Sequence, residues 1–216
     1  ANDAPTASNN TVTTNEDTTY TFTASDFGFS DVDGDTLSSV TVSALSGSDG
    51  TFLLNGVAIT GSTSVTKTQI DSGLLTFVPD SNENGSSYNT FTFTVNDGTT
   101  DSASSYTMTV DVTAVNDAPT ASNNTVTTNE DTDHTFAASE FGFTDVDGDS
   151  LDHVSIETLP SNGTLLLSGS AVSAGDQISA ANISNLVFRP AANANGASYD
   201  TFTFTVNDGT TDSASS

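Results

Sequence analysis

The chain contains one unit of about 110 residues written twice. Residues 2–18 recur letter for letter at residues 116–132, and residues 90–105 recur at residues 201–216. The offset falls from 114 to 111 residues between these matches, so the second copy has three fewer residues in its middle. A unit of this length can bury its own hydrophobic core, whereas repeats of roughly 20–45 residues must stack to do so. The repeat therefore predicts two tandem domains and a linker between them, at residues 1–114, 120–216 and 115–119.

Within a unit the hydrophobic pattern has a period of two. Apolar residues alternate with threonine at residues 20–24, 91–95 and 106–112. This alternation is typical of strands with one buried face and one wet face, and clusters of Asp, Asn and Gly mark turns between them. No stretch predicts a helix. Short strands at this density favour an all-β fold, namely two tandem antiparallel immunoglobulin-like β-sandwiches. In the first copy we expect strands at residues 11–14, 20–24, 37–43, 74–78, 90–95 and 106–113, and a hairpin at residues 51–59.

The second copy contains no counterpart of the last predicted strand. Its final residue, Ser216, matches Ser105, and residues 106–113 have no equivalent after it. We therefore expect the second sandwich to lack its last strand. Two explanations stay open. Either the sequence is a fragment that is cut at this point, or a strand donated by another chain completes the sheet at its open edge.

Acidic side chains dominate the charge of the chain. Asp and Glu number 28 against two Lys and Arg, which gives a formal net charge of −26. Nucleic acid and anionic lipid both require cationic side chains, so we expect neither as a partner. No apolar run is long enough to span a bilayer, so we expect no membrane insertion. The absence of Cys excludes thiol catalysis, disulfides and cysteine metal sites. Counter-cations are therefore the natural partner.

The acidic residues gather in loops that a sandwich brings to its two ends. One end of the first unit would carry the Asn-Asp pair at residues 2–3 and the loops at residues 31–35 and 96–101. The other end would carry the loops at residues 15–17 and 80–84. So many carboxylates repel one another unless they share a cation, and Ca²⁺ fits because it accepts roughly six to eight oxygen ligands in loose geometry. The predicted metal ligands are Asn2, Asp3, Glu16, Asp17, Asp31, Asp33, Asp35, Asp80, Glu83, Asp97, Asn116, Asp117, Glu130, Asp131, Asp145, Asp147, Asp149 and Asp208.

The Asp-x-Asp-Gly-Asp loops differ from an EF-hand loop, which needs Gly at its sixth position and Glu at its twelfth. Counted from Asp31 and from Asp145, the twelfth residues are Val42 and Ile156. A simpler interpretation is also open, because Asp, Asn and Gly favour turns whether or not they bind an ion. It accounts for any single loop, but it explains poorly why several acidic loops and the linker converge.

Several short motifs resemble those of cadherins. The segment Val-Asn-Asp-Ala-Pro at residues 115–119 resembles the cadherin linker, Asn-Glu-Asp at residues 15–17 resembles the glutamate motif of the first strand, and Asp-Val-Asp at residues 31–33 and 145–147 resembles the Asp-x-Asp loop. With these motifs in order, each unit is similar to the cadherin-like or VCBS-type tandem repeats of giant bacterial RTX adhesins.

The resemblance implies extracellular, bacterial cell-surface repeats. It also implies that interdomain Ca²⁺ joins neighbouring repeats of one chain into a stiff stalk, with residues 115–119 as a calcium-binding linker. The sequence departs from the cadherin pattern in places. Ala114 replaces the first linker Asp and the second linker Asn is missing. Asp80 and Glu83 match the Asp-Arg-Glu motif only loosely, and the second unit has Ala191 and Ala194 at these positions.

Other functions are weighed against a calcium-rigidified spacer. The chain has two His, His134 and His153, and neither a Gly-x-Ser-x-Gly nor a His-Glu-x-x-His motif, so we expect no enzyme. The Thr-x-Thr ladders leave open a module that binds carbohydrate or another surface, although Thr also suits the wet face of any strand. The open edge of the second unit leaves open a filament subunit that assembles by strand exchange.

Overall fold

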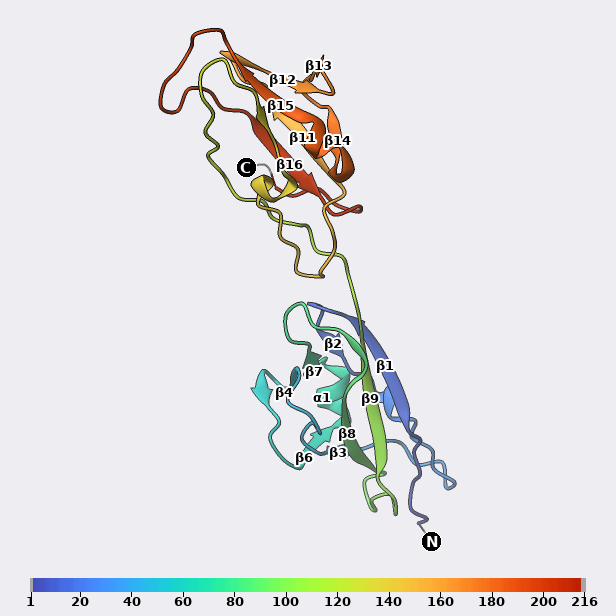
Figure 1. The fold of residues 1–216 in the computed structure, drawn as a ribbon. Coiled ribbons are helices and arrows are strands. Elements are labelled where there is room, and N and C mark those ends of the chain that lie inside the picture. Colours follow the sequence, from blue (N-terminus) through green and yellow to red (C-terminus); the bar gives the residue numbers. More distant parts are fainter. Residues whose placement is uncertain (1, 215–216) are drawn as a thin grey trace. The chain divides into compact units, whose positions relative to one another are not determined.

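The computed structural model describes residues 2–214, which form two units, residues 2–115 and residues 116–214. Each unit contains two β-sheets around a hydrophobic core (Figure 1). The prediction of an all-β fold built from two tandem β-sandwiches is confirmed. The division falls between Val115 and Asn116, inside the segment expected to be the linker.

The larger sheet of unit 1 has the strand order β1-β9-β8-β3-β6. Its pairs are antiparallel except β1 with β9, which run parallel with Asn10 opposite Met108 and Asn15 opposite Thr113. A parallel pair needs a long connection, and residues 16–105 connect these two strands. The expectation of purely antiparallel pairing is therefore wrong for this one pair. The strands are β1 (Asn10–Asn15), β9 (Tyr106–Thr113), β8 (Gly85–Asn96), β3 (Ser39–Val42) and β6 (Thr63–Thr66).

The second sheet of unit 1 has the order β2-β7-β4-β5, with the bounds Tyr20–Thr21, Leu75–Val78, Thr51–Leu54 and Val57–Ala58. Phenylalanine side chains fill the space between the two sheets. Phe22 is fully buried, and its ring centroid lies 5.6 Å from that of Phe52 and 5.5 Å from that of Phe91, both edge to face. These rings come from both sheets, so the alternation in the sequence builds one core.

Helical turns correct the prediction that the chain has none. The expected strand at residues 20–24 ends at Thr21, and a 3₁₀ turn, η1 (Ala24–Phe27), follows it. An α-helical turn, α1 (Lys67–Asp71), is capped by Thr66, whose side chain accepts from the Gln69 N–H at 3.2 Å while the Gln69 side chain accepts from the Thr66 N–H at 2.9 Å. No helix among residues 2–214 is both long and apolar enough to cross a membrane.

Unit 2 is a smaller sandwich with its own core. One sheet has the order β10-β15-β12-β13 and the other β14-β11-β16. The Phe136 and Phe202 rings, which correspond to Phe22 and Phe91, lie 5.6 Å apart edge to face. The elements are β10 (His134–Thr135), η2 (Ala138–Phe141), β11 (His153–Thr158), β12 (Gly163–Leu167), β13 (Ser170–Ala171), β14 (Gln177–Ser179), η3 (Ala180–Asn185), β15 (Leu186–Pro190) and β16 (Thr203–Asn207).

The same six residues fold differently in the two units. The sequence Asn-Thr-Val-Thr-Thr-Asn forms β1 in unit 1, but at residues 124–129 it forms no strand. β1 is held only by β9, and no strand follows β16 among the residues described. Residues 124–129 therefore have no partner strand among the described residues, and an edge strand without a partner has no backbone ladder to join.

Candidate metal centre

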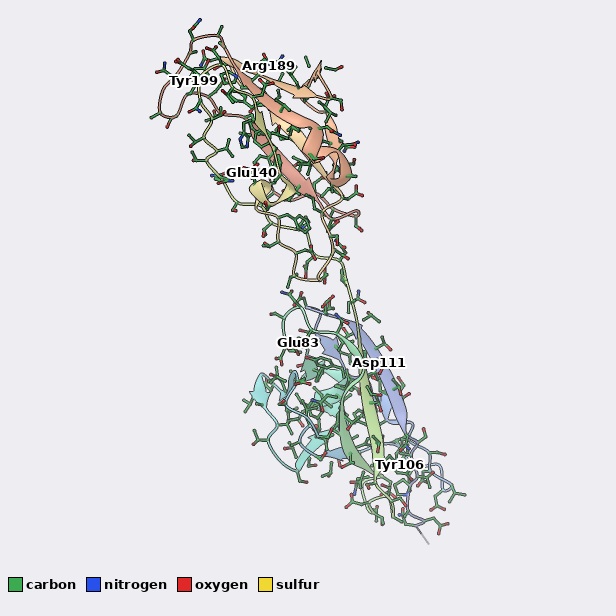
Figure 2. The ribbon with its side chains drawn as sticks, in the orientation of Figure 1. Glu83, Tyr106, Asp111, Glu140, Arg189 and Tyr199 are labelled. Atoms are coloured by element: carbon green, nitrogen blue, oxygen red, sulfur yellow. The ribbon has the colours of Figure 1, made fainter. Side chains whose placement is uncertain are left out.

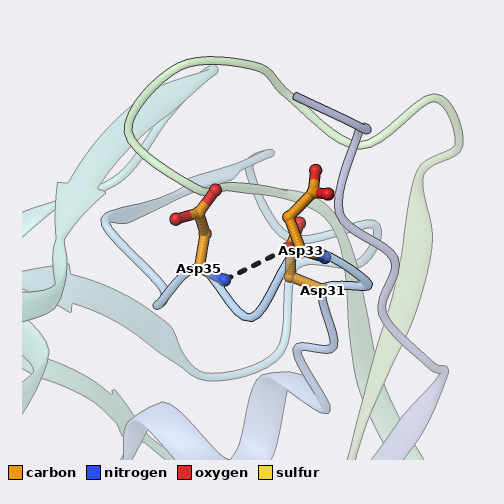
Figure 3. A group of neighbouring side chains, drawn as sticks. All are labelled: Asp31, Asp33 and Asp35. Carbon is orange, nitrogen blue, oxygen red and sulfur yellow. Dashed lines mark hydrogen bonds between the residues drawn. The ribbon is translucent and has the colours of Figure 1, made fainter. Parts of the chain in front are cut away.

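The loop at residues 31–35 folds around the carboxylate of Asp31 (Figure 3). Asp31 Oδ1 accepts the backbone N–H of Asp33 at 2.8 Å and that of Asp35 at 3.2 Å. Gly34 adopts a φ of 85°, which a side chain would disfavour. The other oxygen, Asp31 Oδ2, is buried and has no hydrogen-bond partner among the described residues. One oxygen of the Asp31 carboxylate therefore holds the loop backbone, and the other lacks the hydrogen-bond donor that a buried carboxylate oxygen needs.

The corresponding loop of unit 2, residues 145–149, repeats this arrangement. Asp145 Oδ1 accepts the backbone N–H of Asp149 at 3.0 Å, and Asp145 Oδ2 is buried without a partner among the described residues. In each loop, one carboxylate oxygen from each of the three aspartates lies within 4.8 Å of the other two. In both units, therefore, three carboxylates lie close together, and one of the three has a buried oxygen without a donor.

In unit 1 the Asn-Asp pair at residues 2–3 is fastened to this end of the sandwich. The backbone N–H of Asp3 donates to Asp33 Oδ2 at 2.6 Å, and Asn2 Nδ2 donates to Asp97 Oδ2 at 3.0 Å. The loops at residues 31–35 and 96–101 therefore meet the start of the unit, as the alternation of loops predicts. Asn2 serves as a donor through its nitrogen, which leaves its side-chain oxygen as the atom that can ligate a cation.

Unit 2 holds its own Asn-Asp pair in the same way. The backbone N–H of Asp117 donates to Asp147 Oδ2 at 2.7 Å, and Asn116 Nδ2 donates to Asp208 Oδ2 at 3.0 Å. The part of the predicted linker at Asn116 and Asp117 is therefore built into the sandwich that follows it.

Hydrogen bonds keep two of these carboxylates ionised. The pKa of Asp97 is lowered, chiefly by the Asn2 side chain and the Thr100 N–H. The pKa of Asp208 is lowered, chiefly by the Thr211 N–H and then by the Asn116 side chain. Donors to the charged form favour that form, so both groups keep their negative charge in mildly acidic solution.

Neither Lys nor Arg neutralises these loops. Lys67 pairs with Asp71 within α1, and Arg189 makes a bidentate pair with Asp133 at 2.9 and 2.7 Å. The chain has no other Lys or Arg. Neither cationic side chain therefore pairs with a carboxylate of these loops.

A third group of carboxylates lies at the other end of unit 1. Asp49, Asp80 and Glu83 each place one oxygen within 4.8 Å of the others. Asp80 Oδ2 accepts the Gly50 N–H at 2.9 Å, and Glu83 (Figure 2) accepts the Tyr88 hydroxyl at 2.9 Å. The sequence pointed to Asp80 and Glu83, but Asp49 was missed because Asp-Gly reads as an ordinary turn.

Glu16 and Asp17, which were also expected at this end, are not members of that group. Glu16 is only 2% exposed, and its carboxylate accepts from the Val115 N–H and from Asn84 Nδ2 at 3.3 Å. Asp17 Oδ1 accepts the Asn82 N–H at 3.2 Å. Both side chains therefore stabilise neighbouring backbone and loop segments of unit 1 through hydrogen bonds.

This end of unit 2 lacks a three-carboxylate group among the residues described. Glu130 is exposed and accepts from Asn195 Nδ2 at 2.9 Å, while Asp131 Oδ1 accepts the Asn193 N–H at 2.8 Å. Asp80 and Glu83 correspond here to Ala191 and Ala194, as the sequence comparison indicates. The two ends of unit 2 therefore differ in their capacity for a cation.

Asp200 binds backbone groups at this end instead. Its carboxylate accepts the N–H groups of Ser161, Asn162 and Gly163 at 2.9, 2.6 and 2.8 Å. Burial raises the pKa of Asp200, but these hydrogen bonds outweigh burial and lower it. Asp200 is thus an anion held by backbone donors, and it needs no metal ion.

The donor chemistry of the residue 31–35 and 145–149 loops fits Ca²⁺. All the candidate ligands are carboxylate, amide or backbone oxygens, and no Cys is present. Hard cations with oxygen ligands suit such sites, and Ca²⁺ tolerates irregular geometry better than Mg²⁺ does. A bound cation would also give Asp31 Oδ2 and Asp145 Oδ2 the partner that they lack.

Comparison with known proteins identifies the family. The model of the bacterial Ig domain matches residues 2–113 and again residues 116–216. No curated protein matches the chain. Two solved structures align with it, an endo-fucoidan hydrolase of glycoside hydrolase family 107 at 18% identity and a variant of that enzyme at 19%. Each alignment covers 97% of this chain but 27% of the enzyme, with a TM-score of 0.31, which is too low to indicate a shared fold. The family match covers both units nearly end to end, so the chain belongs to the bacterial Ig domain family and carries two tandem copies of that domain.

Proposed function

We propose that these two domains are spacer repeats of a bacterial surface protein, and that Ca²⁺ bound at one end of each domain stiffens them. The observation that carries the proposal is the buried oxygen without a donor, Asp31 Oδ2 in one unit and Asp145 Oδ2 in the other. Each lies among carboxylates that no Lys or Arg neutralises. We expect a structural task and no catalysis, in line with the bacterial Ig fold.

Within each loop, one carboxylate oxygen holds the backbone and other carboxylate oxygens are available to the ion. Asp145 Oδ1 holds the loop by accepting the Asp149 N–H, which leaves Asp145 Oδ2 for the ion together with oxygens of Asp147 and Asp149. The ion supplies positive charge, and each contact with a carboxylate contributes up to a few kcal/mol at an effective dielectric constant near 20. Dehydration of the ion offsets most of this gain. Extracellular modules of this kind bind Ca²⁺ at about 0.1–1 mM, which matches a protein outside the cell.

Calcium acts on the connection between the domains through two neighbouring residues. The N–H of Val115 is held by Glu16 of unit 1, and the side chain of Asn116 is held by Asp208 of unit 2. A single peptide bond separates these anchors. We propose that Ca²⁺ bound beside Asn116 and Asp117 orders this segment, so that the chain is flexible without Ca²⁺ and stiff with it. The bacterial adhesin stalk and the interdomain position of the ion belong to this proposal.

Calorimetric titration of the whole chain with Ca²⁺ tests the assignment of the ligands. We expect saturable binding by the native protein and the loss of one class of sites in Asp145→Asn combined with Asp147→Asn. Asp176→Asn is the matched control, because Asp176 lies in unit 2 and holds a turn by accepting the Ser173 N–H at 2.8 Å. Equal binding by all three proteins would contradict the assignment.

Small-angle X-ray scattering of the same samples tests the mechanical part of the proposal. Ca²⁺ should narrow the distribution of particle dimensions relative to EDTA, whereas Mg²⁺ at the same concentration should not. The double variant should scatter in Ca²⁺ as the native chain does in EDTA. Binding without any change in scattering would leave a calcium site but refute the stiffening.

A further inference from the structure

One histidine of unit 2 has a ring nitrogen that lacks a hydrogen-bond partner. His153 is the first residue of β11, and its side chain is 14% exposed. Its Nε2 is buried and has no partner among residues 2–214. Buried polar atoms are normally paired, because leaving one unpaired costs free energy. This nitrogen is therefore a position at which a ligand of suitable chemistry would be stabilising.

The other ring nitrogen of His153 determines which form of the ring is present. Nδ1 lies 2.8 Å from Asp152 Oδ2. A carboxylate only accepts hydrogen bonds, so Nδ1 carries the proton and donates it. In the neutral ring, Nε2 then carries a lone pair and can only accept. Histidines that bind metal ions are typically oriented in this way, with one ring nitrogen donating to a carboxylate and the other directed at the metal.

A second carboxylate lies near the Nε2 lone pair. Asp212 Oδ1 is 3.9 Å from His153 Nε2, which is too long for a hydrogen bond. Asn207 Nδ2 donates to the same oxygen at 2.7 Å and so holds the Asp212 carboxylate. Nε2 and Oδ1 both present lone pairs, and lone pairs this close repel each other unless a cation lies between them. The pair therefore has the chemistry of two metal ligands.

We propose that His153 Nε2 and the Asp212 carboxylate bind a divalent transition-metal ion of the Zn²⁺ type, with Asp152 as the residue that positions the ring. Imidazole nitrogen together with carboxylate oxygen suits Zn²⁺, whereas Ca²⁺ takes oxygen ligands. Water would supply the remaining ligands. None of these three residues belongs to the calcium ligands proposed above, so the two proposals stand or fall separately.

The separation of the two ligand atoms is close to what such an ion needs. Metal–ligand distances of about 2.0–2.2 Å in a tetrahedral site place two ligand atoms about 3.4 Å apart. The observed 3.9 Å between His153 Nε2 and Asp212 Oδ1 is therefore about 0.5 Å too long. The Asp212 side chain is 58% exposed, so it can make this adjustment without disturbing the core.

The carboxylate side of the site is present in both units. Residues 207–212 have the same sequence as residues 96–101. In each loop the side-chain amide of the first residue donates to the last residue, Asn207 to Asp212 and Asn96 to Asp101, both at 2.7 Å. This contact belongs to the repeat, and by itself it indicates no metal ion.

The histidine side of the site is confined to unit 2. Asp152 and His153 occupy the places that Ser38 and Ser39 have in unit 1. The backbone is paired in the same way, because the N–H groups of Asp152 and Ser38 both donate to an asparagine carbonyl at 2.8 Å. The ligand and the carboxylate that orients it therefore differ together, while the neighbouring loop keeps its sequence. This is the pattern that a metal site added to one repeat would produce.

Calorimetric titration of the whole chain with ZnCl₂ in excess Ca²⁺ tests the site. Ca²⁺ competes for sites made of oxygen alone and leaves imidazole free. We expect saturable binding of one Zn²⁺ per chain, which His153→Gln should abolish. His134→Gln is the matched control and should bind as the native chain does, because His134 Nε2 already lies 3.2 Å from Glu140 Oε2. Equal binding by the native chain and His153→Gln, or a loss in His134→Gln alone, would overturn the proposal.

Nitrogen-15 NMR of the histidine rings tests the role of Asp152. Zn²⁺ should shift the Nε2 resonance of His153 and leave that of His134 in place. Asp152→Ser, which copies unit 1, should weaken Zn²⁺ binding about 10–100-fold and should give a mixture of His153 ring tautomers before Zn²⁺ is added. A purely structural role for Asp152 would change the thermal midpoint without changing either readout. An Nε2 resonance that does not respond to Zn²⁺ would overturn the assignment of the ligand.

Transfer of the pair to unit 1 tests the geometry by a gain of binding. Ser38→Asp combined with Ser39→His should add a second Zn²⁺ per chain, because Asp101 already has the position of Asp212. Ser39→His alone should bind the second ion more weakly, since the ring lacks its orienting carboxylate. The thermal midpoint of each variant shows that it is folded. A folded double variant that binds no additional Zn²⁺ would overturn the proposal.

Discussion

The carboxylate of Glu16 accepts a hydrogen bond from the backbone N–H of Val115, the last residue of unit 1. Glu16 is 2% exposed, whereas Glu130, which occupies the same place in the repeat, is exposed. One motif thus serves as a buried anchor in one domain and as a surface residue in the other. The difference follows from the presence of β9 and Val115 beside Glu16.

This contrast predicts unequal effects of the same substitution. Glu16→Ala leaves the Val115 N–H without its acceptor, so it should destabilise unit 1 by about 1–3 kcal/mol. Glu130→Ala should change stability by less than about 0.5 kcal/mol, as surface substitutions do. Urea unfolding of the full chain, with hydrogen exchange to assign each transition to a unit, measures both. Equal effects would contradict the role of Glu16 as an anchor.

Val12 and Val126 form a second matched pair with identical neighbours in the sequence. Val12 is 5% exposed beside β9, but Val126 is half-buried. Val12→Ala should cost about 2 kcal/mol, because it removes buried apolar volume and leaves a cavity, whereas Val126→Ala should cost under about 1 kcal/mol. Thermal unfolding of the two variants beside the native chain gives the comparison. A larger loss for Val126→Ala would show that this segment packs more tightly than the structure indicates.

Acid should loosen the contact between Asn116 and Asp208. The Thr211 N–H and the Asn116 side chain lower the pKa of Asp208. The ionised carboxylate therefore stabilises the folded state above the usual Asp pKa of about 3.9. This stabilisation is lost as the pH falls through the lower pKa that Asp208 has in the folded state. Carbon-13 NMR of the carboxyl groups should show Asp208 titrating below the usual range. In Asn116→Ala its midpoint should move up. If the midpoint is the same in both proteins, the hydrogen bond from Asn116 is not a cause of the lowered pKa of Asp208.

Calcium should raise the stability of the folded chain. At 10 mM Ca²⁺ and a dissociation constant of about 0.1–1 mM, binding adds about 1.4–2.7 kcal/mol for each site. Differential scanning calorimetry in Ca²⁺, Mg²⁺ and EDTA measures this shift. An equal shift in Mg²⁺ would point to screening of the net charge rather than to a specific site, and Asp31→Asn combined with Asp145→Asn should remove the specific part.

Most of the strand pattern could be read from the sequence, because alternation of apolar residues and Thr reports directly on a half-buried strand. The turn at α1 could not be read in this way, since five residues with one buried side chain, Ile70, show no helical period. Its signal was the Thr-x-x-Gln cap at residues 66–69. The short β2 was overestimated, because Phe22 and Ala24 continue the alternation after the strand has ended at Thr21.

The acidic loops illustrate a different limit. Order along the chain was enough to bring Asp3, Asp33 and Asp97 to one end of unit 1, because loops of a sandwich alternate between its ends. The sequence could not show which carboxylate oxygen is buried without a donor. Asp31 and Asp33 are the same residue type in one short loop, and only the folded structure distinguishes their burial and hydrogen bonds. Nor could it show whether residues 124–129 form a strand. Their sequence is identical to that of β1, so the difference depends on the partner strand and not on the segment itself.

The parallel pairing of β1 with β9 has a mechanical consequence. The chain enters unit 1 through β1 and leaves it through β9, and the two strands lie side by side over six paired positions. A pull on the two ends of the unit drives these strands past each other in opposite directions, so tension loads their hydrogen bonds together in shear rather than peeling them apart one at a time. In single-molecule stretching, unit 1 should therefore resist a larger force than it would if these hydrogen bonds broke one at a time.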